Sequence, residues 1–329
     1  MSLKKLARNI TMRTNAMPLF YHPSSILILD DDTVFLQASR NLHKNQYRYE
    51  EFVSDAELME FISQYNFSME KLYCDKLIDE DLPYTINYRS LYAYLCNKDR
   101  FMLPSVAIID KNLENKSGID VCKSMGHLGP VRVLLTGYAD FREANAVHNK
   151  GELDLYFEKN IDEVEKLFLG ELPKLSRKFF INKSSLYKGL TDIVSLSEDY
   201  YVLSNDFIIK NKIEEYYTID TCGSLFGISS HGEIYWLIIS NDERMQFYFD
   251  LAAGYGASAG ILKELQEKKQ IPFLMTDKTN EISPKDWGEI LTPVKKHSSL
   301  YYSVFVGSEY LDWDSSKIVT FADSESNLR

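Results

Sequence analysis

Residues Ser25-Ile-Leu-Ile-Leu-Asp30-Asp31-Asp32 close an apolar run with three consecutive carboxylates. Three later apolar runs end close to a polar residue in the same way: Val106–Ile109 before Asp110, Val131–Leu135 before Thr136, and Leu153–Phe157 before Lys159. Short apolar runs of this kind are typical of buried strands. In an open parallel sheet, ligands bind at the edge formed by the carboxyl ends of the strands. The sequence therefore predicts one site that gathers these polar side chains.

The residue types at this predicted site indicate its chemistry. Carboxylate oxygens are ligands for hard divalent cations such as Mg²⁺. A hydroxyl from Thr136 and an amine from Lys159 would complement a phosphoryl group beside that cation. This combination of carboxylates, a hydroxyl and an amine favours a role in signalling over the turnover of a metabolite. An aspartate after a strand is also common as a turn or cap residue, so the prediction depends on the aspartates occurring together.

Strands and helices alternate over residues 24–172. Another strand is predicted at Tyr49–Val53, and helices are predicted at 33–45, 55–65, 117–125, 140–149 and 160–177. Five such units predict an α/β fold, a doubly wound five-stranded parallel sheet with helices on both faces. Residues 66–103 interrupt the pattern. They are rich in tyrosine and acidic residues, and a segment this long is uncommon as a structureless loop, so we expect an ordered insertion with a helix near 86–95.

Residues 173–329 form a predicted second domain of the α+β class, an output domain. Strands are expected at 224–229, 233–240, 271–275 and 300–306, and helices at 206–217, 241–269 and from Ser283. Residues 1–23 form a predicted N-terminal helical extension. Its apolar residues have helical spacing beside three basic residues, which would suit a membrane surface. The apolar stripe covers only about two turns, so we favour docking on protein.

Bulk properties narrow the function classes. The chain has 329 residues and a net charge of −11. Both halves are acidic, which argues against dominant binding to a nucleic-acid backbone. No apolar run approaches the length of about 20 residues needed to span a membrane. The four cysteines form no C-x-x-C pair, so neither a disulfide framework nor a zinc site is expected, and a cytoplasmic location fits.

Residues 24–172 resemble the receiver domains of two-component response regulators. The resemblance rests on Asp30-Asp31, Asp110, Thr136 and Lys159, in this order and on these strand ends. It implies that Asp110 accepts a phosphoryl group from a sensor histidine kinase. It also implies that Mg²⁺ is held by Asp31, Asp110 and the backbone carbonyl of Asn112, with Asp30 acting through water. By the same resemblance, Thr136 and Lys159 contact phosphoryl oxygens. Tyr156 stands where the family has its switch aromatic, although aromatic residues are common in strands in any case.

Some residues depart from the pattern of that family. The usual proline after the phosphorylated aspartate is absent, although Gly118 is present. Asn160 follows Lys159 where proline is typical, and Gly137 follows Thr136 where another small residue is common. None of these differences removes a reacting group. By the same resemblance we expect a homodimer through the receiver face at about 140–177, with phosphorylation shifting its equilibrium.

The role of the output domain stays open on sequence alone. In residues 250–265, small and apolar residues have the spacing of a helix-turn-helix. Gly223-Ser224 stands before a strand, as a Gly-Ser pair does in nucleotidyltransferases. The acidic charge opposes DNA reading, and the next strand lacks the second carboxylate that nucleotide transfer requires. The layout, with Phe20-Tyr21-His22-Pro23 before the first strand, more loosely resembles Legionella-type quorum-sensing response regulators of α-hydroxyketone signalling. The alternatives are a phosphorylation-regulated enzyme and a regulator that binds nucleotide or nucleic acid. No catalysis beyond receiver autophosphorylation and dephosphorylation is expected.

Overall fold

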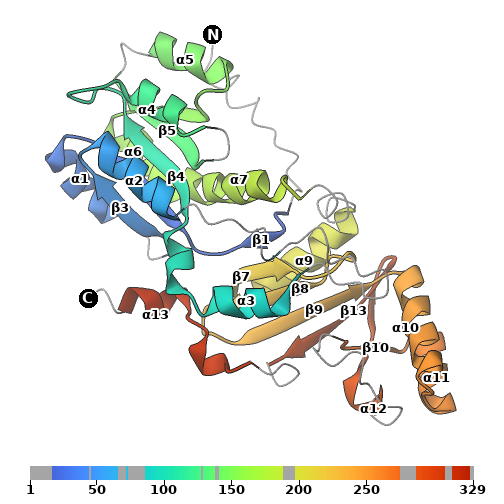
Figure 1. Ribbon diagram of the computed structural model, residues 1–329. Helices are drawn as coiled ribbons and strands as arrows, with labels where there is room; N and C mark the ends of the chain where they lie inside the picture. Colours follow the sequence, from blue (N-terminus) through green and yellow to red (C-terminus); the bar gives the residue numbers. More distant parts are fainter. Residues whose placement is uncertain are drawn as a thin grey trace. The chain divides into compact units, whose positions relative to one another are not determined.

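The computed structural model describes residues 17–43, 46–65, 72, 86–126, 129–137, 141–187, 197–274, 287–307 and 313–326 (Figure 1). The predicted helix in 1–16, half of the insertion (66–71 and 73–85) and the helix start at Ser283 lie outside these residues. The chain groups into two compact units. One comprises 21–71, 93–186 and 321–329, and the other comprises 1–20, 72–92 and 187–320. The predicted domain boundaries after residues 23 and 172 stay predictions.

A five-stranded parallel sheet forms the centre of the first unit. Its strands, in spatial order, are β3 (Arg48–Phe52), β2 (Ser25–Leu29), β4 (Pro104–Asp110), β5 (Val131–Thr136) and β6 (Leu155–Glu158). Strands β2, β4 and β5 are buried throughout, as expected for parallel strands covered on both faces. The order in which the chain adds strands to the sheet reverses between β2 and β4, because β3 lies on one side of β2 and β4 lies on the other, and this places a crevice at their carboxyl ends.

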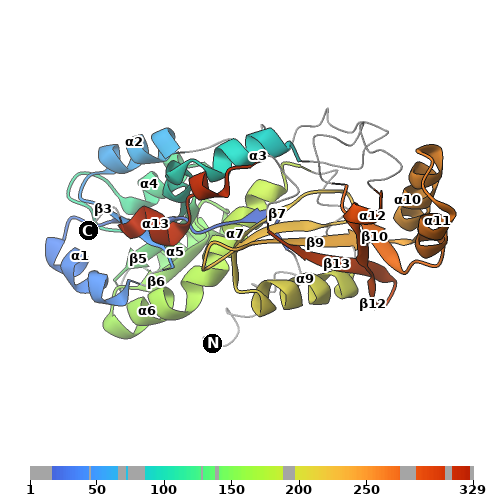
Figure 2. The ribbon, with the colours of Figure 1, turned by 90° about the horizontal axis from the view of Figure 1, so that it is seen from below.

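Helices cover both faces of this sheet. On one face α2 (Asp55–Tyr65), α4 (Gly118–Ser124) and α5 (Phe141–Asn149) share a core with alternate residues of the strands. On the other face α6 (Ile161–Lys166) continues through the π-helical η6 (Leu167–Glu171) into α7 (Leu172–Ser184), and α7 packs on β4 and β5. Figure 2 shows α2 and α6 on opposite sides of the sheet. The predicted fold class of this unit is confirmed.

Several helix bounds differ from those predicted. The helix predicted at 33–45 is shorter, because α1 covers only Thr33–Ser39 and is followed by the 3₁₀ turn η2 (Arg40–Leu42). The helix predicted near 86–95 is α3 (Tyr88–Leu95), followed by η4 (Lys98–Met102). A short C-terminal helix, α13 (Phe321–Ser326), packs on η4 in the same unit, where the rings of Phe101 and Phe321 lie 5.3 Å apart. No pattern in the sequence predicts this contact.

The second unit is built on a six-stranded sheet. Its strands, in spatial order, are β1 (Phe20–Tyr21), β7 (Ile213–Thr218), β8 (Leu225–Ser229), β9 (Ile234–Ser240), β13 (Leu300–Val306) and β12 (Lys295–His297). The pairs from β7 to β12 are antiparallel. A separate pair joins β10 (Gln270–Pro272) to β11 (Leu291–Pro293), and α12 (Trp287–Ile290) precedes β11. The predicted α+β class is confirmed.

Two helix predictions in this unit were wrong. Residues 206–217 form the end of α9 (Glu198–Lys210) and then β7, because Lys212 takes a positive φ of 51° that ends the helix and β7 gains its ladder with β8. The long helix predicted at 241–269 is two helices, α10 (Asp242–Gly254) and α11 (Ala259–Gln266). Gly256 has a φ of 72° and the Ser258 side chain caps α11, so the chain turns between them.

None of the helices in the described residues is long and apolar enough to cross a membrane.

Candidate functional site

The three aspartates after β2 occupy three different environments. Asp30 is fully buried, and its Oδ1 accepts a hydrogen bond from the backbone N–H of Asp32 at 3.0 Å. Asp31 is half-buried, and its Oδ2 accepts from the backbone N–H of Glu114 at 2.7 Å. Asp32 is exposed and accepts from two N–H groups in the first turn of α1. Only the first two are therefore available to the crevice, while Asp32 is the N-cap of a helix.

Asp110 is the last residue of β4 and is 6% exposed. Its Oδ2 accepts a hydrogen bond from the backbone N–H of Asn112 at 2.8 Å. Gly118 passes so close that a Cβ atom there would lie 2.0 Å from the backbone oxygen of Asp110. The absence of a side chain at Gly118 therefore permits the close packing of the start of α4 against Asp110.

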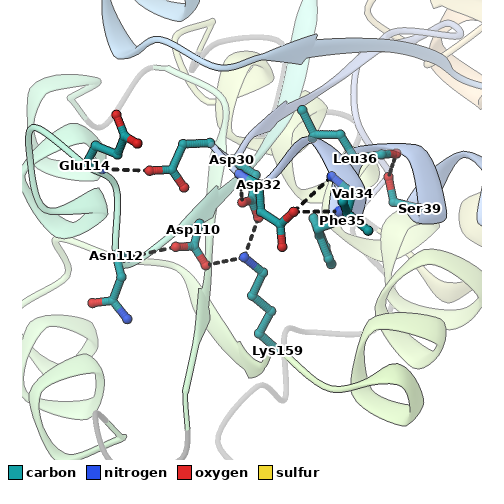
Figure 3. Close-up of polar contacts among 11 residues, drawn as sticks. Asp30, Asp32, Val34, Phe35, Leu36, Ser39, Asp110, Asn112, Glu114 and Lys159 are labelled. Atoms are coloured by element: carbon teal, nitrogen blue, oxygen red, sulfur yellow. Dashed lines mark hydrogen bonds and ion pairs between the residues drawn. The ribbon is translucent and has the colours of Figure 1, made fainter.

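Lys159 lies between the two buried carboxylates (Figure 3). Its Nζ is 2.7 Å from Oδ2 of Asp30 and 3.0 Å from Oδ1 of Asp110. The backbone N–H of Lys159 donates to the carbonyl of Thr136 at 3.0 Å, which fixes the loop after β6 to the end of β5. Asn160, where the receiver pattern has proline, caps α6 by accepting from the N–H of Glu163. No cis peptide bond occurs among the described residues.

The charges at this site shift each other's proton affinity. Burial raises the pKa of Asp30 above its ordinary value, and the hydrogen bond from Lys159 opposes part of that rise. Burial alone would lower the pKa of Lys159, but its hydrogen bonds to Asp30 and Asp110 raise it overall. Lys159 therefore stays a cation and neutralises part of the negative charge in the crevice.

A divalent cation fits the donor set. Oxygens of Asp30, Asp31 and Asp110 lie within 4.8 Å of one another, and they form the one cluster of three or more acidic, histidine or cysteine side chains found in the described part of the chain. All three donors are hard oxygens, the type that Mg²⁺ prefers. Asn112, predicted to add its backbone carbonyl, lies in the loop directly after Asp110 and pairs with Ser117 across an isolated bridge.

The two predicted switch residues lie on neighbouring strands. Thr136 ends β5 and is 1% exposed, and its hydroxyl donates to the carbonyl of Gly137 at 3.3 Å. Tyr156 on β6 is half-buried, and its hydroxyl donates to the side chain of Asn145 on α5 at 3.5 Å. Its ring meets that of His148 edge-on at 6.1 Å. Tyr156 thus contacts α5, the helix that follows Thr136 along the chain.

Sequence reasoning missed two contacts at the site. The ring of Phe35 lies 4.7 Å from Nζ of Lys159, a cation–π contact from the first turn of α1. Lys111, directly after Asp110, is 8% exposed and pairs with Glu143 on α5 at 2.8 Å. A lysine next to the aspartate was visible in the sequence, but its partner 32 positions later carried no signal.

Two acidic residues and one glycine in the output half make structural contacts. Glu233 accepts a hydrogen bond from the hydroxyl of Tyr235, and Asp314 caps the 3₁₀ turn η8 (Ser315–Lys317). Gly223 has a φ of 84° and packs on the Tyr200 ring, where a Cβ atom would approach to 2.4 Å. These contacts give the residues roles in caps, turns and strand pairs.

Known proteins match this chain by structure but not by sequence. No model of a known protein family matches, and no curated protein matches significantly. Among solved structures, the response regulator LqsR of Legionella pneumophila superposes with a TM-score of 0.75 at 23% identity, covering 96% of this chain and 97% of that chain. This protein therefore has the fold of that response regulator, in both of its units.

Receiver domains alone match about half of the chain. A response regulator receiver domain protein from Clostridium thermocellum covers 50% of this chain and 98% of its own, at 18% identity and a TM-score of 0.31. A CheY-like receiver domain protein from Methanospirillum hungatei covers 48% and 96%, at 17% identity and a TM-score of 0.31. Both scores lie below 0.5, so the shared fold is inferred from the Legionella structure.

Proposed function

We propose that this chain is a phosphorylation-switched response regulator, in which Asp110 accepts a phosphoryl group from a histidine of a sensor kinase. The observation that carries the proposal is the placement of Lys159 Nζ within 3.0 Å of two buried carboxylates, beside the half-buried Asp31. A purely structural ion pair needs one carboxylate. Two acidic groups that share one lysine, with a third acidic group beside them at a strand-end crevice, leave excess negative charge, which a cation can neutralise.

Each residue of the site has a proposed task. An oxygen of Asp110 attacks the phosphorus, and the bond from phosphorus to the donor nitrogen breaks. Lys159 releases Asp110 to pair with a phosphoryl oxygen, and keeps Asp30. Thr136 turns its hydroxyl from the weak 3.3 Å bond to Gly137 toward another phosphoryl oxygen. Tyr156, which contacts α5, responds to the resulting movement of the loop after Thr136.

Mg²⁺ is the proposed cofactor. Asp31, Asp110 and the backbone carbonyl of Asn112 would hold it, with Asp30 acting mainly through water. When bound, the ion would reduce the repulsion between these carboxylates and an incoming phosphoryl group. Asp31 is suited to direct ligation because it is half-buried and already oriented by the Glu114 N–H. Asp30 is fully buried and paired with Lys159, which favours an indirect contact.

The proposed partners are sensor histidine kinases and a second copy of the chain. The receiver face formed by α5, β6 and α6–α7 is the proposed dimer surface, because Thr136 and Tyr156 border it. The similarity of fold to the Legionella regulator, together with the layout of the sequence, supports a role in quorum sensing.

Light scattering with and without phosphodonor would test the proposed dimer, and the substitution Lys166→Glu on α6 should weaken it. A monomer in both states would reject it.

Phosphorylation of Asp110 is tested directly by intact mass. The wild-type chain, incubated with acetyl phosphate and Mg²⁺, should gain one phosphoryl group, and Asp110→Asn should gain none because the amide is not a nucleophile for this transfer. Asp120→Asn is the matched control, since Asp120 lies on α4 outside the crevice, with 57% of its side chain exposed. Equal labelling of Asp110→Asn and wild type would disprove the assignment.

A further inference from the structure

Lys111 is a buried cation next to the proposed phosphoacceptor. Its side chain is 9% exposed. Its backbone is held on both sides, because its N–H donates to Leu135 and its carbonyl accepts from Gly118, each at 2.9 Å. Only the side chain is therefore able to change direction. Neighbouring Cα atoms along the chain are about 3.8 Å apart, so the flexible lysine stem starts within reach of groups bound to Asp110.

The carboxylate that pairs with Lys111 comes from a helix. Glu143 lies in the first turn of α5, and its Oε2 is 2.8 Å from Nζ of Lys111. The two partners differ in their surroundings, because the Glu143 side chain is 61% exposed. A buried cation needs a nearby anion, whereas an exposed carboxylate loses little when it returns to water. Lys111 can therefore exchange Glu143 for another anion at little cost in free energy.

The pair also joins the phosphoacceptor strand to the helix that follows the proposed switch residue Thr136. Lys111 follows β4, while α5 follows β5 and the Thr136 loop. Ala144 and Val147 hold one face of α5 in the core. The Lys111–Glu143 contact adds a polar tether between the start of α5 and the phosphoacceptor strand.

We propose that the Lys111–Glu143 ion pair is a latch that holds α5 in the unphosphorylated position and opens when Asp110 is phosphorylated. This inference rests on the proposed function. When the Asp110 oxygen binds phosphorus and the donor bond to phosphorus breaks, one carboxylate charge is replaced by a phosphoryl charge of about −2. Lys111 then turns to a phosphoryl oxygen, Glu143 enters water, and the start of α5 loses its tether. Lys111 acts here as a positioning residue for α5.

Two substitutions distinguish a latch from a structural ion pair. Lys111→Met keeps the apolar stem and removes the charge, and Glu143→Gln keeps the shape of the carboxylate and removes its charge. Both break the tether, so both should speed hydrogen exchange in the peptide covering α5 before any phosphodonor is added. Their effects on phosphorylation should be opposite. Lys111→Met loses a cation for the phosphoryl group, whereas Glu143→Gln removes the anion that competes for that cation.

The experiment uses the full-length chain with acetyl phosphate and Mg²⁺. We expect the rate of phosphoryl uptake at Asp110 to fall about threefold to tenfold in Lys111→Met and to rise about threefold in Glu143→Gln, as for modest couplings between sites. Phosphorylation should speed α5 exchange in the wild type and change it little in either variant. Glu152→Gln is the control, since Glu152 makes a 3.8 Å pair with Lys123 away from the crevice, and it should behave as wild type.

The outcomes separate the two proposals. If wild-type Asp110 takes up label but both variants shift the uptake rate in the same direction, the latch is wrong and the proposed function stands. The latch is equally overturned if α5 exchange in Lys111→Met equals that of the wild type. If the wild type takes up no label on Asp110, the proposed function fails and the latch fails with it. Opposite shifts in uptake, combined with faster α5 exchange in both variants, support the latch.

Discussion

Removing the charge of Lys159 should destabilise the unligated protein and make its stability depend on pH and Mg²⁺. Lys159→Met leaves a side chain of similar length beside Phe35 but takes the cation from between Asp30 and Asp110. Asp30 is then a fully buried carboxylate without its main counter-charge. Breaking a buried ion pair by removing one partner typically costs 3–5 kcal/mol. Because 24% of the Lys159 side chain is exposed, water compensates in part, and we expect a loss of about 2–4 kcal/mol at pH 7.

The pH dependence follows from the direction of the Asp30 shift. Burial already raises the pKa of Asp30 above its unfolded value, and the loss of Lys159 removes an opposing influence, so the pKa of the folded state rises further. The folded state then binds a proton more readily than the unfolded chain. The penalty is full above the raised folded pKa and is relieved as pH falls through it. The variant should therefore recover part of its stability as pH falls from 7 toward the ordinary pKa of an aspartate, because Asp30 becomes neutral in the folded state first.

Urea unfolding at pH 7 and pH 5, with and without Mg²⁺, measures these terms. By the proposed function, Mg²⁺ would bind the folded crevice and replace the lost positive charge, so it should stabilise the variant more than the wild type. Lys174→Met is the control, since Lys174 is 72% exposed and pairs with Glu171 on the surface, and it should change stability by less than about 1 kcal/mol. A loss in Lys159→Met no larger than in the control, or the same at both pH values, would refute the reasoning.

Three further substitutions test the rest of the site and its support. Gly118→Ala places a Cβ atom 2.0 Å from the Asp110 backbone oxygen and should cost about 2–3 kcal/mol in urea unfolding, while Gly254→Ala, which meets nothing within 4 Å, should not destabilise. Asp31→Ala should weaken Mg²⁺ binding by calorimetric titration at least about tenfold and leave the fold intact; an unchanged titration contradicts the proposed ligand set. Burial would raise the pKa of Asp154, but hydrogen bonds from Lys178 and Arg132 lower it overall. The ionised Asp154 therefore stabilises the folded protein near pH 7, and this stabilisation is lost as pH falls below the pKa of the unfolded state and through the lower pKa of the folded state. Asp154→Asn should remove that acid-side loss, and a slope in stability equal to the wild type would contradict this.

The parallel sheet was predictable because its three central strands, β2, β4 and β5, are buried on both faces. Strands such as Ile26–Leu29 and Val106–Ile109 are continuous apolar runs, and the polar residue after each one identifies the edge where the site lies. The antiparallel sheet was predicted less well. The segment Ile213–Thr218 contains two glutamates and two tyrosines and has no clear period. Its strand conformation depends on pairing with β8, which local sequence does not encode.

Contacts between distant segments were the part that sequence could not supply. Gly118 was recognised as a glycine in the expected place, but the 2.0 Å approach that requires it depends on how α4 meets β4. The Lys111–Glu143 pair likewise depends on the position of α5. Charge and residue type predicted which groups would gather at the crevice. Which carboxylate pairs with which cation is decided by tertiary packing.

The three consecutive aspartates show how tertiary packing gives identical residues different environments. Their identical side chains lie in a fully buried site beside Lys159, a half-buried site beside Glu114, and an exposed helix cap. Burial thus separates their energetic roles. Asp30 balances the charge of Lys159, Asp32 initiates a helix, and Asp31 keeps the solvent access that its proposed role as a ligand requires. Replacing each in turn by asparagine should accordingly alter different quantities. Asparagine also caps helices well, so the change at Asp32 should be nearly silent, whereas the same change at Asp30 leaves Lys159 with one carboxylate and shifts it toward Asp110.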